Sequence, residues 1–190
     1  MRRNLKLFPL QEQMRASESE ILDKLITGFL CHADTDVEAF LKNNAIKYER
    51  KGLSRTYLYI YDDGTSAYVV AYFTIAITST SFKKISKSRK ANVLGFKPGR
   101  DTKDHFGGIL IGQLGRADGF DSSDINGQEM IEDAESIIEK GRYYLGGKIV
   151  YLDCKEPLIK LYKDNGYKLV IKTPYQGGYY KMFKVLPELN

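Results

Sequence analysis

Hydrophobic residues at helical spacing mark the first part of the chain. Between Ile21 and Leu30 the apolar positions recur every three or four residues, and serines with acidic neighbours precede them, which predicts a helix. The same spacing returns after Asp34 and predicts a second helix that ends at Gly52. Two helices are therefore expected before any strand.

The pattern then changes to that of strands. Residues 56–61 are aromatic and β-branched, and residues 67–78 continue this character after an Asp-Asp-Gly-Thr turn signal. These two segments are predicted to form a β-hairpin. Residues 79–105 are rich in lysine, serine and glycine and are expected to form an excursion from the sheet.

Strands and helices alternate in the second half of the chain. We expect strand 108–115, helix 124–145, strand 148–152, helix 157–165 and strands 167–171 and 179–185. This order predicts an α/β fold with a mixed central sheet of about six to seven strands flanked by helices. In such sheets ligands bind beyond the carboxyl ends of strands, so the loop before helix 124–145 is the expected site.

Composition narrows the class of protein. The 190 residues carry 43% hydrophobic side chains, which is enough for one packed domain. Two cysteines without a CxxC pair predict neither a disulfide framework nor a zinc site, so no metal is expected. No apolar run approaches the roughly 20 residues of a membrane helix, and the apolar stretch near the start ends at Leu10, too soon for a signal peptide. A cytoplasmic protein with no membrane partner is expected.

The net charge is +5, but basic and acidic side chains are unevenly distributed along the chain. Residues 81–105 hold eight basic and two acidic side chains, whereas residues 106–140 hold two and eight. The basic segment 83–103 fits either a solvated loop or a surface for a nucleic acid backbone. The acidic block contains the expected ligand site.

Three stretches of the chain resemble one enzyme superfamily. They are helix 36–50 with its following hairpin, the strand Leu110 to Arg116, and the strand-helix-strand unit from Tyr151 to Tyr167. In this order they are similar to the GNAT superfamily of acyl-CoA-dependent N-acetyltransferases, and closest in pattern to its toxin-type bacterial members. The resemblance covers about residues 36–185 and implies a single GNAT-like domain over 1–190. Its core would be 36–186, and 1–35 would be an N-terminal extension with a helix.

The resemblance implies a binding loop for acetyl-CoA. The family holds the cofactor pyrophosphate on a motif of Arg or Gln, two residues, Gly, one residue, then Gly or Ala. That motif falls here on Ser122, Ser123, Asp124, Ile125, Asn126 and Gly127, followed by Gln128. Only Gly127 matches it, and Asp124 adds a negative charge where the pyrophosphate would lie. This departure supports an alternative function, a GNAT-fold module that binds or inhibits without catalysis.

The resemblance also implies the catalytic groups. Backbone N–H groups of Leu114, Gly115 and Arg116 would polarise the acetyl carbonyl as an oxyanion hole. Tyr162 would act as general acid toward the leaving thiolate. The acceptor would be a primary amine on an aminoacyl-tRNA, a protein or a small molecule, with the basic segment 83–103 bordering the acceptor side. A homodimer and an antitoxin-like partner are further implications of the toxin-type resemblance.

The remaining reactive residues favour structural roles. Cys31 and His32 are neighbours without further ligands at metal-binding spacing, and Cys154 ends an apolar strand. His105, just before the central strand, is a weak candidate for a general base. Tyr144 and Tyr167 are expected in the core.

Overall fold

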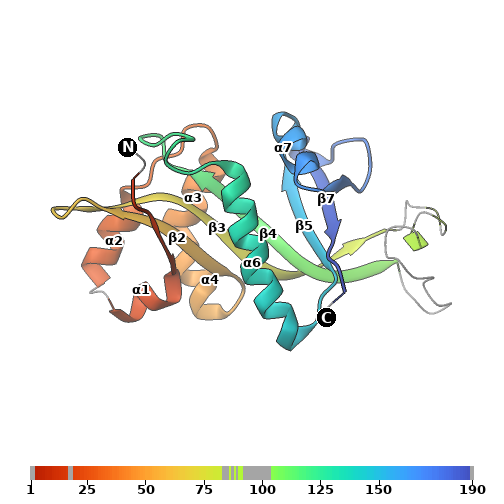
Figure 1. The fold of residues 1–190 in the computed structure, drawn as a ribbon, viewed down its shortest axis with the longest axis horizontal. Coiled ribbons are helices and arrows are strands. Elements are labelled where there is room, and N and C mark those ends of the chain that lie inside the picture. The colour runs from red at the N-terminus through yellow and green to blue at the C-terminus, as the bar shows by residue number, and fades with distance from the viewer. Residues whose placement is uncertain are drawn as a thin grey trace. The chain divides into compact units, whose positions relative to one another are not determined.

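The computed structural model describes residues 3–16, 19–82, 86, 88, 90, 91 and 104–188. They form one mixed seven-stranded sheet, in the order β1-β2-β3-β4-β5-β7-β6, and six α-helices (Figure 1). In chain order the elements are β1 (Lys6–Pro9), α1 (Leu10–Ala16), α2 (Ser19–Thr27), α3 (Thr35–Asn43), α4 (Ala45–Lys51), β2 (Arg55–Asp62), β3 (Ala67–Ser81), β4 (His105–Arg116), α6 (Gly127–Leu145), β5 (Ile149–Cys154), α7 (Ile159–Asp164), β6 (Lys168–Leu169) and β7 (Tyr180–Val185), with short 3-10 turns at Glu156–Leu158 and Gln176–Gly178. The predicted α/β class and strand number are confirmed.

Two features near the N-terminus differ from the sequence expectation. Strand β1 and helix α1 were not predicted, yet β1 pairs antiparallel with β2, with Phe8 opposite Leu58. The single helix expected after Asp34 is two helices, α3 and α4, separated at Asn44. The predicted start near Asp34 and the predicted end at Gly52 are both confirmed. The Asp34 carboxylate caps the start of α3 by accepting from Asp36 N at 3.2 Å. Gly52 ends α4 in the left-handed conformation, with a φ of 68°.

The chain packs as two compact units. The first comprises Met1–Ala76 and Ile111–Ala134, and the second comprises Ile77–Leu110 and Glu135–Asn190. Strands β3 and β4 and helix α6 each contribute residues to both units. The expectation of a single domain stays a prediction, and each unit has its own core.

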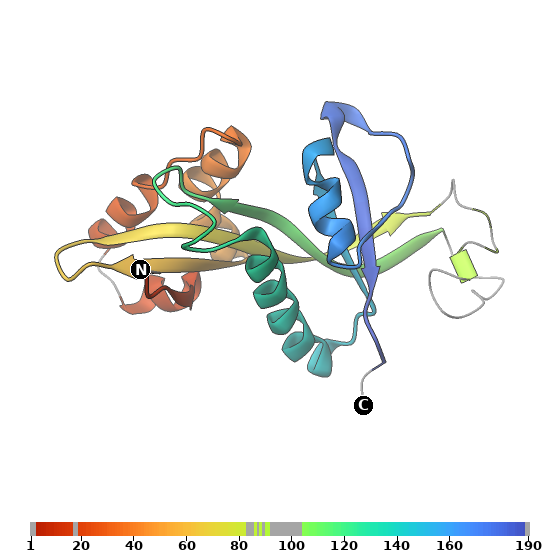
Figure 2. The same ribbon diagram turned by 45° about the horizontal axis from the view of Figure 1, so that its top comes forward.

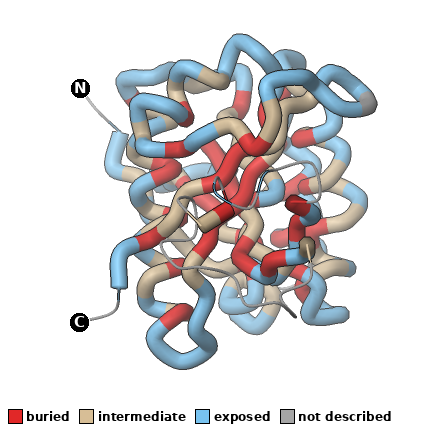
Figure 3. The backbone as a smooth tube through the Cα atoms, turned by 90° about the vertical axis from the view of Figure 1, so that its right-hand side faces the viewer, coloured by how far each residue is buried: buried red, intermediate tan, exposed pale blue. Residues whose placement is uncertain are grey.

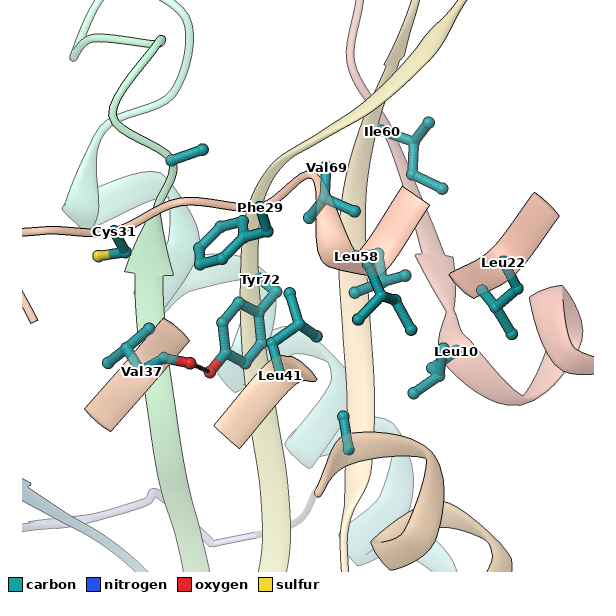
Figure 4. Close-up of a cluster of buried hydrophobic side chains, with 13 residues drawn as sticks. Leu10, Leu22, Phe29, Cys31, Val37, Leu41, Leu58, Ile60, Val69 and Tyr72 are labelled. Carbon is teal, nitrogen blue, oxygen red and sulfur yellow. Dashed lines mark hydrogen bonds between the residues drawn. The ribbon is translucent and has the colours of Figure 1, made fainter. Parts of the chain in front are cut away.

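The core of the first unit packs α1, α2 and α3 against β2 and β3 (Figure 4). Tyr72 lies at its centre, fully buried, with its ring edge-on to Phe29 at a centroid distance of 5.3 Å. Its hydroxyl donates to Val37 O at 2.5 Å, which links β3 to α3. A tyrosine is tolerated at this depth because its hydroxyl has a hydrogen-bond partner.

The core of the second unit is rich in aromatic side chains. Phe82 lies edge-on to Phe106 and to Phe183, at centroid distances of 5.3 and 6.0 Å. Strands β5 and β7 pair antiparallel, with Tyr151 opposite Phe183. Figure 2 shows β7 as the blue arrow that runs toward the C-terminus. A Cβ at Gly108 would lie 2.4 Å from Ile149 O, so β4 approaches β5 closely at this glycine.

Burial follows the strands, whereas the connecting loops are mostly exposed (Figure 3). Within the described ranges, no helix combines the length and the apolar character required to cross a bilayer. The residues that the sequence analysis singled out lie mainly at the ends of β4 and β5.

Candidate functional site

The loop after β4 begins by staying bound to the sheet. Ala117 N donates to Val70 O at 2.8 Å, and Asp118 N donates to Leu30 O at 2.9 Å. Both contacts lie within the first unit, and the chain leaves the sheet after residue 117, where the connection between α2 and α3 holds it next. The ten residues from Asp118 to Gly127 then carry most of the predicted cofactor site.

Gly115 is required by packing. A Cβ at this position would lie 2.4 Å from Val37 Cγ1, far inside van der Waals contact, so β4 and α3 approach each other only because this side chain is missing. The predicted role of the Leu114 and Gly115 backbone in polarising an acetyl carbonyl stays a prediction. The sequence around Gly115 carries no signal of this packing role.

Arg116 forms hydrogen bonds to two backbone carbonyl groups of the loop. Its Nη1 donates to Ile125 O at 2.7 Å and its Nε donates to Phe120 O at 3.2 Å. The guanidinium therefore satisfies two carbonyl groups of the loop and fixes its path. Ile125, a residue of this loop that stands where the family has a glycine, is itself buried.

A serine-aspartate turn follows. The backbone N and the Oγ of Ser123 both donate to Asp121 Oδ1 at 2.7 Å. These hydrogen bonds from Ser123 lower the pKa of Asp121, because they favour its charged form. Ser122 is exposed, so its hydroxyl and N–H stay at the surface of the loop.

The charge of Asp124 is compensated by a residue that the sequence analysis missed. Asp124 is 3% exposed, and both carboxylate oxygens accept from Arg3 Nη1 at 2.6 Å. The Arg3 guanidinium also lies over the Phe120 ring at 5.1 Å and near the Tyr61 ring at 5.7 Å. The negative charge expected to oppose a pyrophosphate is thus neutralised by an internal cation.

Helix α6 begins with a capping box. Asn126 Oδ1 accepts from Glu129 N at 2.9 Å, and Glu129 Oε2 accepts from Asn126 N at 3.0 Å. The next N–H groups, those of Gly127 and Gln128, belong to the first turn of the helix and have no partner inside it. Such groups are suited to an anion, although the Glu129 carboxylate lies beside them.

A pocket of about 650 Å³ lies beside the same helix start within the first unit. Three of the side chains that line it are acidic, namely Glu129, Glu132 and Asp133. Asp133 Oδ2 accepts from the hydroxyl of Tyr59 at 2.7 Å. This acidic lining disfavours a pyrophosphate in the pocket, so an anion would have to bind at the helix N-terminus itself.

Tyr162 lies in the second unit, on α7. Its side chain is 5% exposed, and its ring is edge-on to that of Tyr167 at 5.8 Å. Burial, and then the nearby Cys154, raise the pKa of Tyr162, so its phenol stays protonated at neutral pH. Burial also raises the pKa of Cys154 to about 11, which keeps that side chain as an inert thiol.

The basic segment 83–103 falls almost entirely outside the described residues. Lys90 is its described cation, and this side chain is buried and paired with Asp104. Lys90 therefore has a structural role. The predicted acceptor surface on this segment stays a prediction.

The other residues of interest divide into buried and exposed. Cys31, Cys154 and Tyr167 are buried as expected, but the expectation for Tyr144 is wrong, since it is 82% exposed at the end of α6. His32 is exposed and its ring pairs with Asp118, while His105 lies exposed at the start of β4. Among the described residues no three His, Cys, Asp or Glu side chains are grouped to hold a metal ion.

Comparisons with known proteins identify the fold. No protein-family model matches the chain, and no curated protein matches its sequence. A comparison with solved structures shows that the chain has the fold of the GNAT toxins. A structure described as a bacterial toxin shares 20% identity and a TM-score of 0.73, covering 97% of this chain and 92% of that one.

Two AtaT structures are also similar. AtaT complexed with acetyl-methionyl-tRNAfMet has 14% identity and a TM-score of 0.68, with 96% of this chain and 95% of that chain covered. A tyrosine-to-phenylalanine mutant of the AtaT toxin, bound to the C-terminus of the antitoxin AtaR and to acetyl-CoA, has 14% identity and a TM-score of 0.62 over 95% and 92%. At these identities the likeness establishes the fold.

Proposed function

We propose that this chain is an acetyl-CoA-dependent N-acetyltransferase whose acceptor is the amino group of an aminoacyl-tRNA. The observation that carries the proposal is Tyr162, a buried and protonated phenol on the helix that follows β5 in a GNAT fold. The AtaT complex with acetyl-methionyl-tRNAfMet supports the choice of acceptor.

The residues divide the chemistry as follows. Backbone N–H groups of Leu114, Gly115 and Arg116 stabilise the negative charge on the carbonyl oxygen when the acceptor amine forms its new C–N bond. Tyr162 gives its proton to the thiolate as the C–S bond breaks, and hydrogen bonding must make this transfer concerted because a phenol is a weaker acid than a thiol. The amine loses its proton to solvent, and Tyr162 regains from solvent the proton that it gave to the thiolate.

The start of α6 fits the anionic end of acetyl-CoA. The N–H groups of Gly127 and Gln128 would hold the pyrophosphate, with the exposed Ser122 as a neighbouring donor. Ser123 would have to give up its hydrogen bonds to Asp121 before it could donate as well. Arg3 neutralises Asp124, and this removes the main electrostatic objection to an anion in this loop. Ile125 and Asn126 contribute shape and capping to the loop.

Direct titration with acetyl-CoA tests the proposal. Calorimetry is expected to show saturable binding, and the absence of binding at high micromolar concentration would contradict it. Tyr162→Phe should lower kcat at least tenfold while the Kd for acetyl-CoA stays within twofold, as expected for a general acid. Tyr167→Phe, which alters the neighbouring ring in the same way, should leave kcat within about twofold.

The acceptor is tested separately. Charged tRNA should be acetylated on its amino acid, whereas deacylated tRNA should yield no product. If expression of the chain arrests growth, Tyr162→Phe should relieve the arrest. Acetylation of small amines or protein lysines, with charged tRNA left unmodified, would move the acceptor to another class.

A second candidate function is favoured by the closed loop before α6. The Ser123 N and Oγ donors are already taken by Asp121, and the Glu129 N donor is taken by Asn126, so these groups are not available to a pyrophosphate. We infer as the alternative a GNAT-fold module that binds or inhibits a partner without catalysis. The acetyl-CoA titration separates the two, because the alternative expects no saturable binding.

The same comparisons support a proposal about partners. The AtaT mutant bound to the C-terminus of AtaR supports an antitoxin-like partner for this chain. A homodimer remains part of the proposal. Light scattering after gel filtration measures the oligomeric state, and a monomer at micromolar concentration would remove the homodimer.

A further inference from the structure

A cluster of aromatic and cationic side chains lies beyond the end of β5 in the second unit. The rings of Tyr175 and Tyr179 lie against each other with an interplanar angle of 30° and a centroid distance of 6.2 Å. Lys155 Nζ lies 5.7 Å from the Tyr179 ring centroid, and Lys181 Nζ lies 5.9 Å from that of Tyr175. Each ring is therefore paired with one ammonium group.

The turn between the two tyrosines is built to bring their rings together. Tyr175 N donates to Tyr179 O at 2.9 Å, and Gly178 N donates to Tyr175 O at 3.1 Å. Gly177 and Gly178 have φ of 82° and 76°, values that favour glycine. A Cβ at Gly177 would lie 3.3 Å from the Tyr179 ring, so a glycine at this position also leaves room for the ring.

The cluster is accessible and its surroundings are basic. Tyr175 is 41% exposed and Lys155 is exposed. Asp153 is the acidic neighbour, 3.3 Å from Lys181 Nζ, and it compensates part of that charge. Residues 148–184 nevertheless contain eight lysines and three acidic residues.

Stacked rings with adjacent cations match the chemistry of a single-stranded nucleic acid. Each nucleobase offers a flat face to an aromatic ring, and each nucleotide brings a phosphate for a lysine. The 6.2 Å spacing is too narrow for a base between the two rings, so a base would stack on the exposed face of Tyr175. An acidic peptide would use the lysines but would leave the aromatic faces without a partner.

The position of the cluster relates it to Tyr162. Lys155 is the first residue after β5, and the same connection leads into α7 and Tyr162. Figure 1 shows α7 and the loop between β6 and β7 at the same end of β5. The cluster and the proposed general acid are therefore carried by neighbouring segments of one unit.

We propose that Tyr175, Tyr179, Lys155 and Lys181 form a platform that binds the single-stranded 3′-terminal nucleotides of the tRNA acceptor. This inference rests on the proposed function and assigns residues to its acceptor side. It places nucleic acid contacts on a surface other than segment 83–103.

Fluorescence anisotropy with the full chain and a labelled single-stranded RNA ending in CCA tests the platform. Tyr175→Ala should weaken binding about 5- to 100-fold, whereas Tyr175→Phe, which keeps the ring, should stay within about twofold. Lys155→Ala should reduce the slope of log K against log salt concentration by about 0.7 in magnitude, because one phosphate contact is lost. Lys160→Ala is the matched control, because this exposed lysine of α7 pairs with Asp164 outside the cluster.

The outcomes separate this inference from the proposed function. Tyr175→Ala should keep the unfolding midpoint, the Kd for acetyl-CoA and any acetylation of a small amine unchanged. RNA binding by Tyr175→Ala at wild-type strength, or no binding of the oligonucleotide by the wild type, would overturn the platform and leave the acetyltransferase proposal standing. Failure of the wild type to bind acetyl-CoA, with RNA binding intact, would overturn the acetyltransferase proposal instead.

Discussion

The loop before α6 and the turn between Tyr175 and Tyr179 differ in how far their polar and aromatic groups are engaged by the rest of the chain. In the first, Arg116, Ser123 and Arg3 each satisfy a carbonyl or carboxylate group of the loop. In the second, two glycines fix the backbone while an aromatic ring stays exposed. The first loop is closed by its own side chains, whereas the second keeps the Tyr175 side chain exposed.

This difference bears on how each region would bind its ligand. A ligand at the closed loop adds to contacts that already hold the backbone, so little ordering of the chain is required, but the contacts leave few free donors. A ligand at the open turn meets aromatic faces whose position is set in advance, which lowers the entropic cost of binding. We therefore expect mutations in the closed loop to affect stability and mutations in the open turn to affect binding.

The ion pairs of the two regions should show the largest contrast. Arg3→Ala leaves the Asp124 carboxylate buried without its cation, which is strongly destabilising, so the unfolding midpoint should fall by several degrees. Lys181→Ala breaks a pair whose two side chains are each 31% exposed and should shift the midpoint far less. Circular dichroism during heating measures both. Equal shifts would show that Arg3 does not hold the loop.

Gly115→Ala should have the next largest effect. The new Cβ would overlap Val37 Cγ1, and overpacking of this kind costs about 1–3 kcal/mol of unfolding free energy. Gly119→Ala, in the loop that follows β4, is the matched control, since no atom beyond its chain neighbours lies within 4 Å of a Cβ there. Urea denaturation compares the two. A neutral Gly115→Ala would mean that β4 and α3 separate readily.

The capping box gives a smaller effect. Asn126→Ala removes the acceptor for Glu129 N and should cost about 1 kcal/mol of stability, while Asn126→Asp keeps a side-chain oxygen at the cap and should cost much less. The same denaturation experiment measures both variants. If alanine and aspartate behave alike, the start of α6 is held by its tertiary packing and not by the cap.

Local patterns in the sequence were sufficient for most elements. The strands β2, β3, β5 and β7 were predicted because their period and composition are local properties. Strand β1 has only four residues, too few to show a period, and its existence depends on pairing with β2. The partner of Asp124 could not be predicted, because Arg3 lies 121 positions away in the sequence.

Periodicity also misled at the end of α6. Tyr144 continues the apolar spacing of the helix, but Tyr143, Tyr144 and Leu145 are all more than 70% exposed. The pattern describes a face of a helix and does not tell whether anything covers its last turn. Similarly, the sequence indicates a turn at Gly177 and Gly178. It does not show that this turn brings two tyrosine rings together, or that Lys155 and Lys181 lie beside those rings.

Glu129→Gln tests the smallest and most specific difference between the two regions. Glutamine keeps the capping box, because its carbonyl oxygen can still accept from Asn126 N, but it removes a negative charge beside the N–H groups of the first turn. Acetyl-CoA should then bind about two- to fivefold more tightly. Glu132→Gln makes the same charge change one turn further along α6 and should have a weaker effect. If both variants tighten binding equally, the gain comes from the net charge of the acidic block, and the start of α6 does not contact the pyrophosphate.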